Sequence, residues 1–81
     1  MIGRLRNLGP NQIEVNISNT ITVLYSYNTP VACHAAGEGY YRTATRHSKT
    51  TSRHINTWLD GEIARERPQA YFDNLVGEAG A

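Results

Sequence analysis

The sequence has little of the residue types and patterns that most directly indicate a function. It contains one cysteine, Cys33, so no disulfide can form within the chain and a reducing compartment is expected. No apolar run approaches the ~18 residues that a membrane span needs, so no membrane association is expected. The net charge is only +1, a smaller basic excess than a dedicated nucleic-acid-binding domain usually carries.

The length of 81 residues fits one domain, residues 1–81, and is too short for two. A domain of this size buries only about 60% of the surface of its unfolded chain, so its core is thin. Five tyrosines are many for so short a chain, and tyrosine is enriched in protein interfaces. We therefore expect a homo-oligomer.

Alternating polar and apolar residues in the first half of the chain predict β-strands. Ser18-Asn19 and Gly37-Glu38-Gly39 are turn sequences that separate neighbouring strands. The pattern predicts an antiparallel meander of four or five strands within about residues 2–45. The predicted strands cover residues 2–8, 12–17, 20–27, 31–36 and 40–45.

The spacing of apolar residues then changes to that of a helix. Ile55, Trp58 and Leu59 share one face of a helix predicted at about residues 51–60. Asp60-Gly61 supplies its stop. The residues expected to offer N-cap hydroxyls are Thr50, Thr51 and Ser52.

A second helix is predicted at about residues 68–76, because Pro68 suits a first helical position. Gly77 is expected to break this helix and to leave a frayed tail at 77–81. Ile63 and Ala64 extend the first helix or form a short turn between the two. The predicted fold class is therefore α+β, a small antiparallel sheet with one or two helices packed on it.

Charge is segregated along the chain although the net charge is small. Residues 39–59 include four lysines and arginines and no acid, whereas residues 60–81 include five acids and two arginines. The basic segment is rich in hydroxyl groups and leads into a predicted helix. A helix N-terminus presents unpaired N–H groups and the positive end of the helix dipole. Arginine adds paired hydrogen bonds to phosphate.

The basic segment thus predicts a site for a phosphorylated nucleotide, with Tyr40 or Tyr41 stacking on the base. The alternative interpretation is a solvated loop that only caps the helix. The predicted ligand-binding residues are Tyr40, Tyr41, Arg42, Arg46, Lys49, Thr50, Thr51, Ser52, Arg53 and His54.

Nothing in the sequence indicates an enzyme. Cys33 and His34 are adjacent, and adjacent residues of a strand point to opposite faces, so these side chains would not meet. Cys33 is expected to be a buried, inert thiol. The three histidines have no acidic cluster beside them, and His54 is expected on the exposed side of its helix. No catalytic residue, metal or cofactor is predicted.

Three segments of the chain form a recognisable pattern. They are Ser26-Tyr27-Asn28-Thr29-Pro30-Val31-Ala32, Tyr41-Arg42-Thr43, and Ser48-Lys49-Thr50-Thr51-Ser52-Arg53-His54-Ile55-Asn56 with Trp58-Leu59. This pattern resembles that of a family of short, mostly uncharacterised proteins of bacteriophages and prophages. The resemblance covers about residues 20–60 and implies a phage origin and a recurrent fold, but it transfers no catalytic residue.

The phage origin that the resemblance implies favours a binding protein. We expect a non-enzymatic protein of the host-cell cytoplasm that holds a phosphorylated nucleotide, linear or cyclic, and sequesters a host defence signal. Two alternatives stay open. One is a protein–protein inhibitor of a host defence protein, and the other is a small nucleic-acid-binding protein, which the net charge of +1 disfavours.

Overall fold

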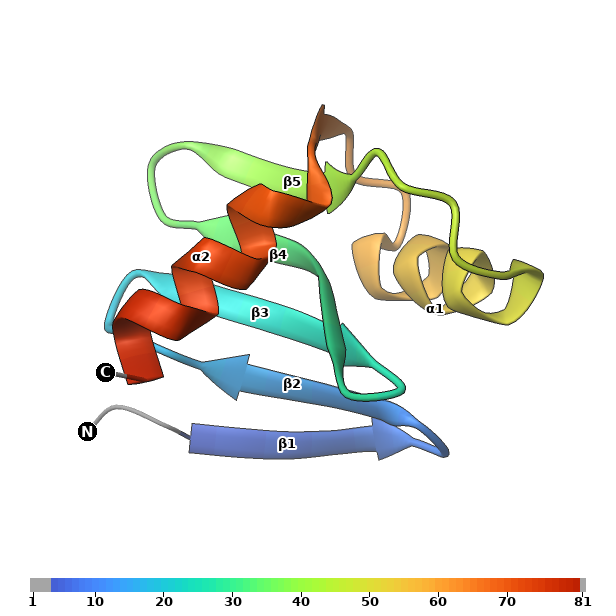
Figure 1. The fold of residues 1–81 in the computed structure, drawn as a ribbon, viewed down its shortest axis with the longest axis horizontal. Coiled ribbons are helices and arrows are strands. Elements are labelled where there is room, and N and C mark those ends of the chain that lie inside the picture. The colour runs from blue at the N-terminus through green and yellow to red at the C-terminus, as the bar shows by residue number, and fades with distance from the viewer. Residues whose placement is uncertain (1–3, 81) are drawn as a thin grey trace.

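The computed structural model describes the backbone of residues 4–80 and the side chains of residues 5–77. Six strands form one sheet, and two helices pack on it (Figure 1). The elements in chain order are β1 (Arg4–Gly9), β2 (Gln12–Asn16), β3 (Ile21–Ser26), β4 (Thr29–Ala35), β5 (Gly39–Thr43), α1 (Lys49–Leu59), β6 (Ala64–Arg67) and α2 (Gln69–Gly80).

The sheet confirms the α+β prediction and extends it by one strand. Strands β1 to β5 form an antiparallel meander in sequence order. The predicted first strand began at residue 2, and residues 2–3 lie outside the described part of the chain. The interpretation of Ala64 as helix or turn was wrong, because Ala64 begins β6, which pairs in parallel with β5, whereas Ile63 lies in the connection between α1 and β6. The four residues of β6 are too few and too polar to show a strand pattern by themselves.

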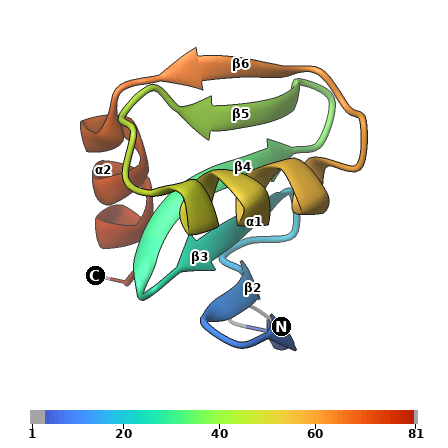
Figure 2. The ribbon, with the colours of Figure 1, turned by 90° about the vertical axis from the view of Figure 1, so that its right-hand side faces the viewer.

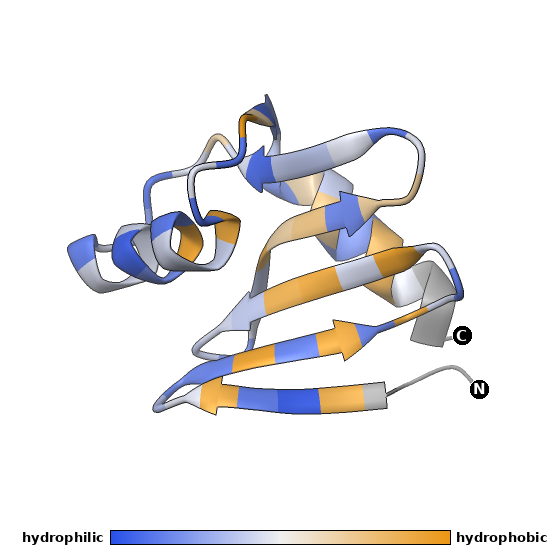
Figure 3. Ribbon diagram, turned by 180° about the vertical axis from the view of Figure 1, so that it is seen from behind, coloured by the Kyte–Doolittle hydropathy of each residue, from blue (hydrophilic) through white to orange (hydrophobic). Residues whose placement is uncertain are grey.

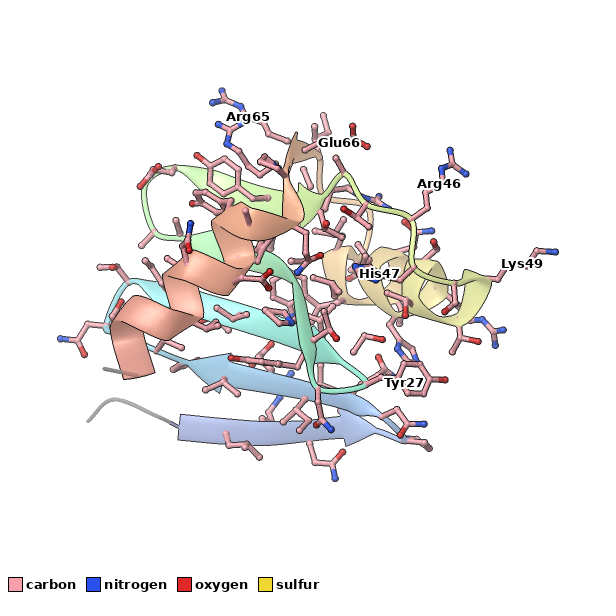
Figure 4. All side chains as sticks on the ribbon, viewed as in Figure 1. Tyr27, Arg46, His47, Lys49, Arg65 and Glu66 are labelled. Carbon is pink, nitrogen blue, oxygen red and sulfur yellow. The ribbon has the colours of Figure 1, made fainter. Side chains whose placement is uncertain are left out.

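The turn between β3 and β4 also differs from the prediction. Tyr27 was expected at the end of a strand, but it lies with Asn28 in a turn where both residues have positive φ, 51° and 67°. Two successive positive φ values suit a tight hairpin, because they match the twist of the flanking strands. As a result Tyr27 projects from the end of the sheet (Figure 4).

The two helices cover opposite faces of the sheet (Figure 2). On the α2 side, Val23, Cys33 and Tyr41 pack with Phe72, and on the α1 side Leu24 packs in a second cluster with residues of α1. Each fully buried large apolar side chain contributes about 1.5–3 kcal/mol through its removal from water. Figure 3 shows hydrophobic residues concentrated on the central strands, whereas α1 and the segment leading into it are largely hydrophilic.

Cys33 is buried, as predicted, and its burial makes the thiol unreactive. The thiol is free and buried. Burial, followed in size by the nearby charge of Glu38, raises the pKa of Cys33 from 9.0 to about 11. A thiol in that state carries almost no thiolate near neutral pH, so it is a poor nucleophile.

Helix α1 begins two residues earlier than predicted, and the expected caps were wrong. Ser48 is the N-cap, and its hydroxyl oxygen accepts a hydrogen bond from the backbone N–H of Thr51 at 3.1 Å. Asp60 ends the helix in the left-handed conformation, where Asp60-Gly61 was expected to stop it.

Helix α2 begins at Gln69, directly after Pro68, whose carbonyl accepts from the N–H of Tyr71 at 2.9 Å. The predicted break at Gly77 was wrong, because the helix continues to Gly80. Glycine weakens a helix interior by about 1 kcal/mol relative to alanine, which is not by itself enough to end one. Of the predicted frayed tail, Ala81 lies outside the described residues. Neither described helix has the length and apolar character needed to span a membrane.

Candidate functional site

A cavity of about 570 Å³ lies at the N-terminal end of α1. It is formed by the segment that follows β5 and by one side of the helix. Three of its lining residues are lysine or arginine, and no lining residue is an acid. The lining residues are Arg46, His47, Ser48, Lys49, Ser52, Arg53 and Asn56.

The helical repeat brings the lining residues of α1 together. Lys49, Ser52, Arg53 and Asn56 are spaced by three, one and three positions, so they form one stripe along the helix. A different stripe, which includes Ile55, is buried against the sheet. Packing of the apolar stripe therefore directs the polar stripe toward the cavity.

The electrostatics at this end of α1 favour an anion. The first turn of the helix contains no acid, so the positive end of the helix dipole is not compensated. Within the described residues, no hydrogen-bond acceptor lies against the N–H groups of Lys49 and Thr50. These two N–H groups are therefore available donors at the start of the helix.

Arg46 and Lys49 lie on the rim of the cavity and do not converge. Figure 4 shows Arg46 and Lys49 extending away from the body of the protein, whereas His47 points back toward it. The rim cations thus supply positive potential around the opening. In this structure they do not enclose a preformed pocket for one phosphate group.

His47 is held by Gln69 at the start of α2. The amide nitrogen of Gln69 donates to the carbonyl of Pro30 at 2.7 Å. The side-chain oxygen of Gln69 is therefore the atom that lies 2.9 Å from Nε2 of His47, and this oxygen can only accept. Nε2 of the His47 ring therefore carries the proton in this hydrogen bond. This contact fixes the segment before α1 against α2.

Behind the cavity, a row of hydroxyl groups leads into the protein interior. The Ser48 hydroxyl donates to Oγ1 of Thr51 at 3.2 Å. Oγ1 of Thr51 lies 3.1 Å from the hydroxyl oxygen of Ser26, which lies 2.8 Å from Nδ1 of His54. Thr51 is thus used inside the fold and does not line the cavity at the helix N-terminus.

The prediction that His54 is exposed was wrong. His54 is 8% exposed and Ser26 is 2% exposed. His54 lies on the sheet-facing stripe of α1 next to Ile55, and Ser26 on β3 offers it a polar partner. An imidazole can be buried here because its Nδ1 is hydrogen-bonded.

Arg42 lies beside the cavity and does not line it. Its guanidinium donates to the side-chain oxygen of Asn56 at 3.2 Å. Arg42 lines a smaller cavity of about 170 Å³, which also includes Arg46, Ser52 and the acidic Glu66. Thr50, which was also predicted to bind the ligand, is half-buried and lines neither cavity.

The structure does not bring Tyr40 and Tyr41 to the site. Adjacent residues of β5 point to opposite faces, so only one of them can face α1. Tyr41 lies on the α2 side, where the Arg67 guanidinium stacks 4.8 Å from its ring centroid. Tyr40 lies on the α1 side, but its ring is 5.7 Å from that of Trp58, in the last turn of the helix. The expected base-stacking role of these tyrosines at the α1 cavity is therefore corrected.

Three lining residues, His47, Ser48 and Asn56, were not among the residues predicted from the sequence. Asn56 could have been found, because it lies three and four positions after Arg53 and Ser52 on the same helical stripe. Whether His47 and Ser48 line the cavity depends on the path of the segment before α1. Among the described residues, no group of three potential metal ligands is present.

Comparison with known proteins gives a family and no further relative. No curated protein and no solved structure is detectably similar to this chain. One family model matches residues 3–74, a span that includes every residue lining the α1 cavity. The chain therefore belongs to DUF8033, a family of unknown function.

Proposed function

We propose that this protein is a non-enzymatic binding module that holds a phosphorylated small molecule at the N-terminal end of α1. The observation that carries the proposal is the cavity of about 570 Å³ whose lining includes Arg46, Lys49 and Arg53 but no acid. Cavities of about 300–1,000 Å³ are typical of sites for molecules of drug or nucleotide size.

The hydrogen-bonding groups at the cavity suit phosphate oxygens. The N–H groups of Lys49 and Thr50 and the helix dipole would stabilise one phosphate group at the start of α1. The rim cations would turn inward onto the ligand, which costs about 0.5–1.5 kcal/mol for each side chain that is ordered. A hydrogen bond to a charged group contributes about 1.5–3 kcal/mol, which is more than the cost of ordering the side chain that makes it.

We further propose a nucleotide, linear or cyclic, as the ligand. The support is strongest for its phosphate groups, because neither Tyr40 nor Tyr41 faces the cavity. If the phage origin implied by the sequence resemblance holds, the protein would act in the host-cell cytoplasm and sequester a nucleotide defence signal. Binding alone would be sufficient for that role.

Thermal unfolding with added ligand tests the proposal. Inorganic pyrophosphate, ATP and a cyclic dinucleotide at millimolar concentration should each be added to the full chain. A ligand that binds the folded state raises the melting temperature by mass action, with about 2.7 kcal/mol of stabilisation at 100 times its Kd. A melting temperature unchanged by all three compounds would overturn the proposal.

A matched pair of variants locates the binding. Arg53→Ala removes a lining cation and should reduce the shift in melting temperature. Arg65→Ala removes an exposed cation on β6, which lies well away from Arg46 and Lys49 in Figure 4, and should leave the shift unchanged. Equal effects of the two variants would indicate nonspecific attraction to the net charge.

A second candidate function, protein–protein binding, has one specific observation in its favour. Ile63, between α1 and β6, is 92% exposed, and burying such a large aliphatic side chain against a partner would contribute about 1.5–3 kcal/mol. The partner would be a second copy of the chain or a host defence protein. If a second copy binds there, Ile63→Ser should convert an oligomer into a monomer in sedimentation equilibrium.

A further inference from the structure

A separate hollow lies on the α1 side of the sheet, near the C-terminal end of α1. Its volume is about 230 Å³, and it shares Arg6 and Glu14 with an adjacent hollow of about 400 Å³ along β1 and β2. It has no lining residue in common with the α1 cavity. The residues that line it are Arg6, Glu14, Thr22, His34, Tyr40 and Trp58.

Strand register brings these side chains to one place. Arg6 pairs with Glu14 across β1 and β2, and His34 pairs with both Thr22 and Tyr40 across β3, β4 and β5. Directly paired residues of neighbouring strands point to the same face. Trp58 reaches this face from α1, and its indole N–H donates to a carboxylate oxygen of Glu14 at 2.8 Å. The hollow is therefore built from five strands and a helix.

Three half-buried rings form its floor. The ring of Tyr40 lies 4.6 Å from that of His34, with 47° between their planes, and 5.7 Å from that of Trp58, with 81° between their planes. Tyr40 is thus tilted against both neighbours, and the rings make an angled apolar surface. Such a surface leaves no parallel slot between these ring pairs for a flat nucleobase.

The polar groups of the hollow combine donors and acceptors of opposite charge. The Glu14 carboxylate lies 3.7 Å from the Arg6 guanidinium, and the Glu14 side chain is 20% exposed whereas that of Arg6 is 70% exposed. A carboxylate has about four lone-pair positions and a guanidinium has five N–H donors, so both groups keep hydrogen-bonding capacity. The Thr22 hydroxyl donates to the side-chain oxygen of Asn16 at 3.1 Å and still has lone pairs to accept with.

We propose that this hollow binds one ring of a neutral saccharide. The C–H face of a sugar ring is apolar and would rest on Tyr40 and Trp58. Its hydroxyl groups both donate and accept, so they would bond to Glu14 and Arg6 together. Sites for drug-sized ligands have volumes of about 300–1,000 Å³. The hollow, at about 230 Å³, is smaller and has room for one ring.

Two other ligand classes fit this hollow less well. A phosphorylated ligand would meet the Glu14 carboxylate, and the Arg6 and Glu14 charges cancel, so the hollow lacks the basic excess that phosphate needs. A quaternary ammonium group would bind the ring faces, but it has no hydrogen-bond donor or acceptor for Glu14 and Arg6. A neutral, hydroxyl-rich molecule satisfies both the rings and the paired charges. The adjacent hollow along β1 and β2 would receive the next sugar unit of a longer chain.

Trp58 is the single tryptophan of the chain and therefore reports on this hollow alone. The indole N–H signal of Trp58 in a ¹H–¹⁵N NMR spectrum should be followed as four neutral oligosaccharides are each added: maltohexaose, N-acetylated chitotriose, xylohexaose and mannotriose. We expect a saturable shift with at least one oligosaccharide at about 10 mM or below, the range of weak binding. Adenosine and tetramethylammonium serve as comparison ligands. The proposal is overturned if no oligosaccharide moves the signal, or if only a comparison ligand does.

Variants make the test specific to the hollow. Arg6→Ala removes an exposed side chain and should weaken saccharide binding about tenfold, which corresponds to roughly 1.4 kcal/mol. Arg65→Ala on the opposite edge of the sheet should bind as the unchanged protein does. Arg53→Ala at the α1 cavity should also leave saccharide binding intact, which separates this proposal from the phosphate site. Unchanged affinity in Arg6→Ala would overturn the assignment.

Discussion

The hydroxyl oxygen of Ser26 on β3 lies 2.8 Å from Nδ1 of His54 on α1, and both side chains are buried. This contact joins the helix to the sheet through a polar pair beside the apolar cluster that α1 forms with the sheet. Through Thr51 the same row of hydrogen bonds continues to Ser48, the N-cap of α1. The position of the α1 cavity therefore depends on a buried network as well as on apolar packing.

Replacing Ser26 should test this network directly. Ser26→Ala would leave Nδ1 of His54 without its partner in a buried site, and unfolding free energy should fall by about 1–3 kcal/mol. Urea denaturation followed by circular dichroism would measure the change. Thr57→Ala, on the exposed side of α1, is the control and should change stability by less than about 0.5 kcal/mol. Equal stability of Ser26→Ala and the unchanged protein would contradict the network.

The N-cap assignment leads to a second prediction. Ser48→Ala removes the side-chain oxygen that accepts from the N–H of Thr51, and it should lower the unfolding free energy by about 1 kcal/mol. Thr50→Ala, at a position that the sequence suggested as a cap, should have a smaller effect because Thr50 is not the N-cap. Chemical denaturation of both variants distinguishes the two positions. A larger loss for Thr50→Ala would show that Ser48 is not the cap.

The raised pKa of Cys33 predicts a pH dependence of stability. The pKa is about 11 in the folded protein, mainly through burial, against 9.0 for an ordinary thiol. Between pH 9 and pH 11 the thiol keeps its proton in the folded state and loses it in the unfolded state. The stability that the neutral thiol contributes is therefore complete below pH 9 and decreases as the pH rises to 11. The total decrease is about 2–3 kcal/mol.

Comparison with Cys33→Ala measures this contribution together with its coupling to Tyr71, whose pKa is raised by burial and then by the nearby Cys33 charge. The stability advantage of the unchanged protein over the variant should shrink as pH rises from 9 to 11, the two pKa values of the thiol. Guanidinium denaturation at several pH values measures the difference. A constant difference across this range would indicate that Cys33 is not shielded from water.

Salt dependence separates the proposed small ligand from a nucleic acid. A protein that binds single-stranded DNA by neutralising several phosphates loses affinity with a log–log salt slope of about −0.7 for each phosphate. Because the three cations cluster at one end of α1, a 20-nucleotide strand should bind no more tightly than pyrophosphate. Isothermal titration at several salt concentrations measures both. A steep slope with preferential DNA binding would favour the nucleic-acid alternative.

The strand and core pattern was largely predictable. Alternation in β3 places Val23 and Leu24 on opposite faces, and each face is buried under a different helix. The helical spacing of Ile55 and Leu59 likewise identified the buried side of α1. The strand β6 was not predictable, because Ala64–Arg67 carries no periodic signal and forms a strand only where the edge of β5 offers hydrogen-bonding partners.

The candidate site was predicted in part. Arg46, Lys49, Ser52 and Arg53 do line one cavity. Tyr40 and Tyr41 do not, because strand alternation sends them to different faces and places Tyr40 near the other end of α1. The hollow that Tyr40 shares with Arg6 and Glu14 had no signal in the sequence, since its residues are spread over six elements.

Local order and local charge were therefore decided by the sequence itself. Period-two and helical spacing follow from backbone geometry, and the run of cations without acids before and within α1 is a property of neighbouring residues. Tertiary structure alone decided which distant groups meet, such as His54 with Ser26 and Trp58 with Glu14. The physical reason is that these contacts depend on strand register and on how α1 lies on the sheet, neither of which any short segment of the chain specifies.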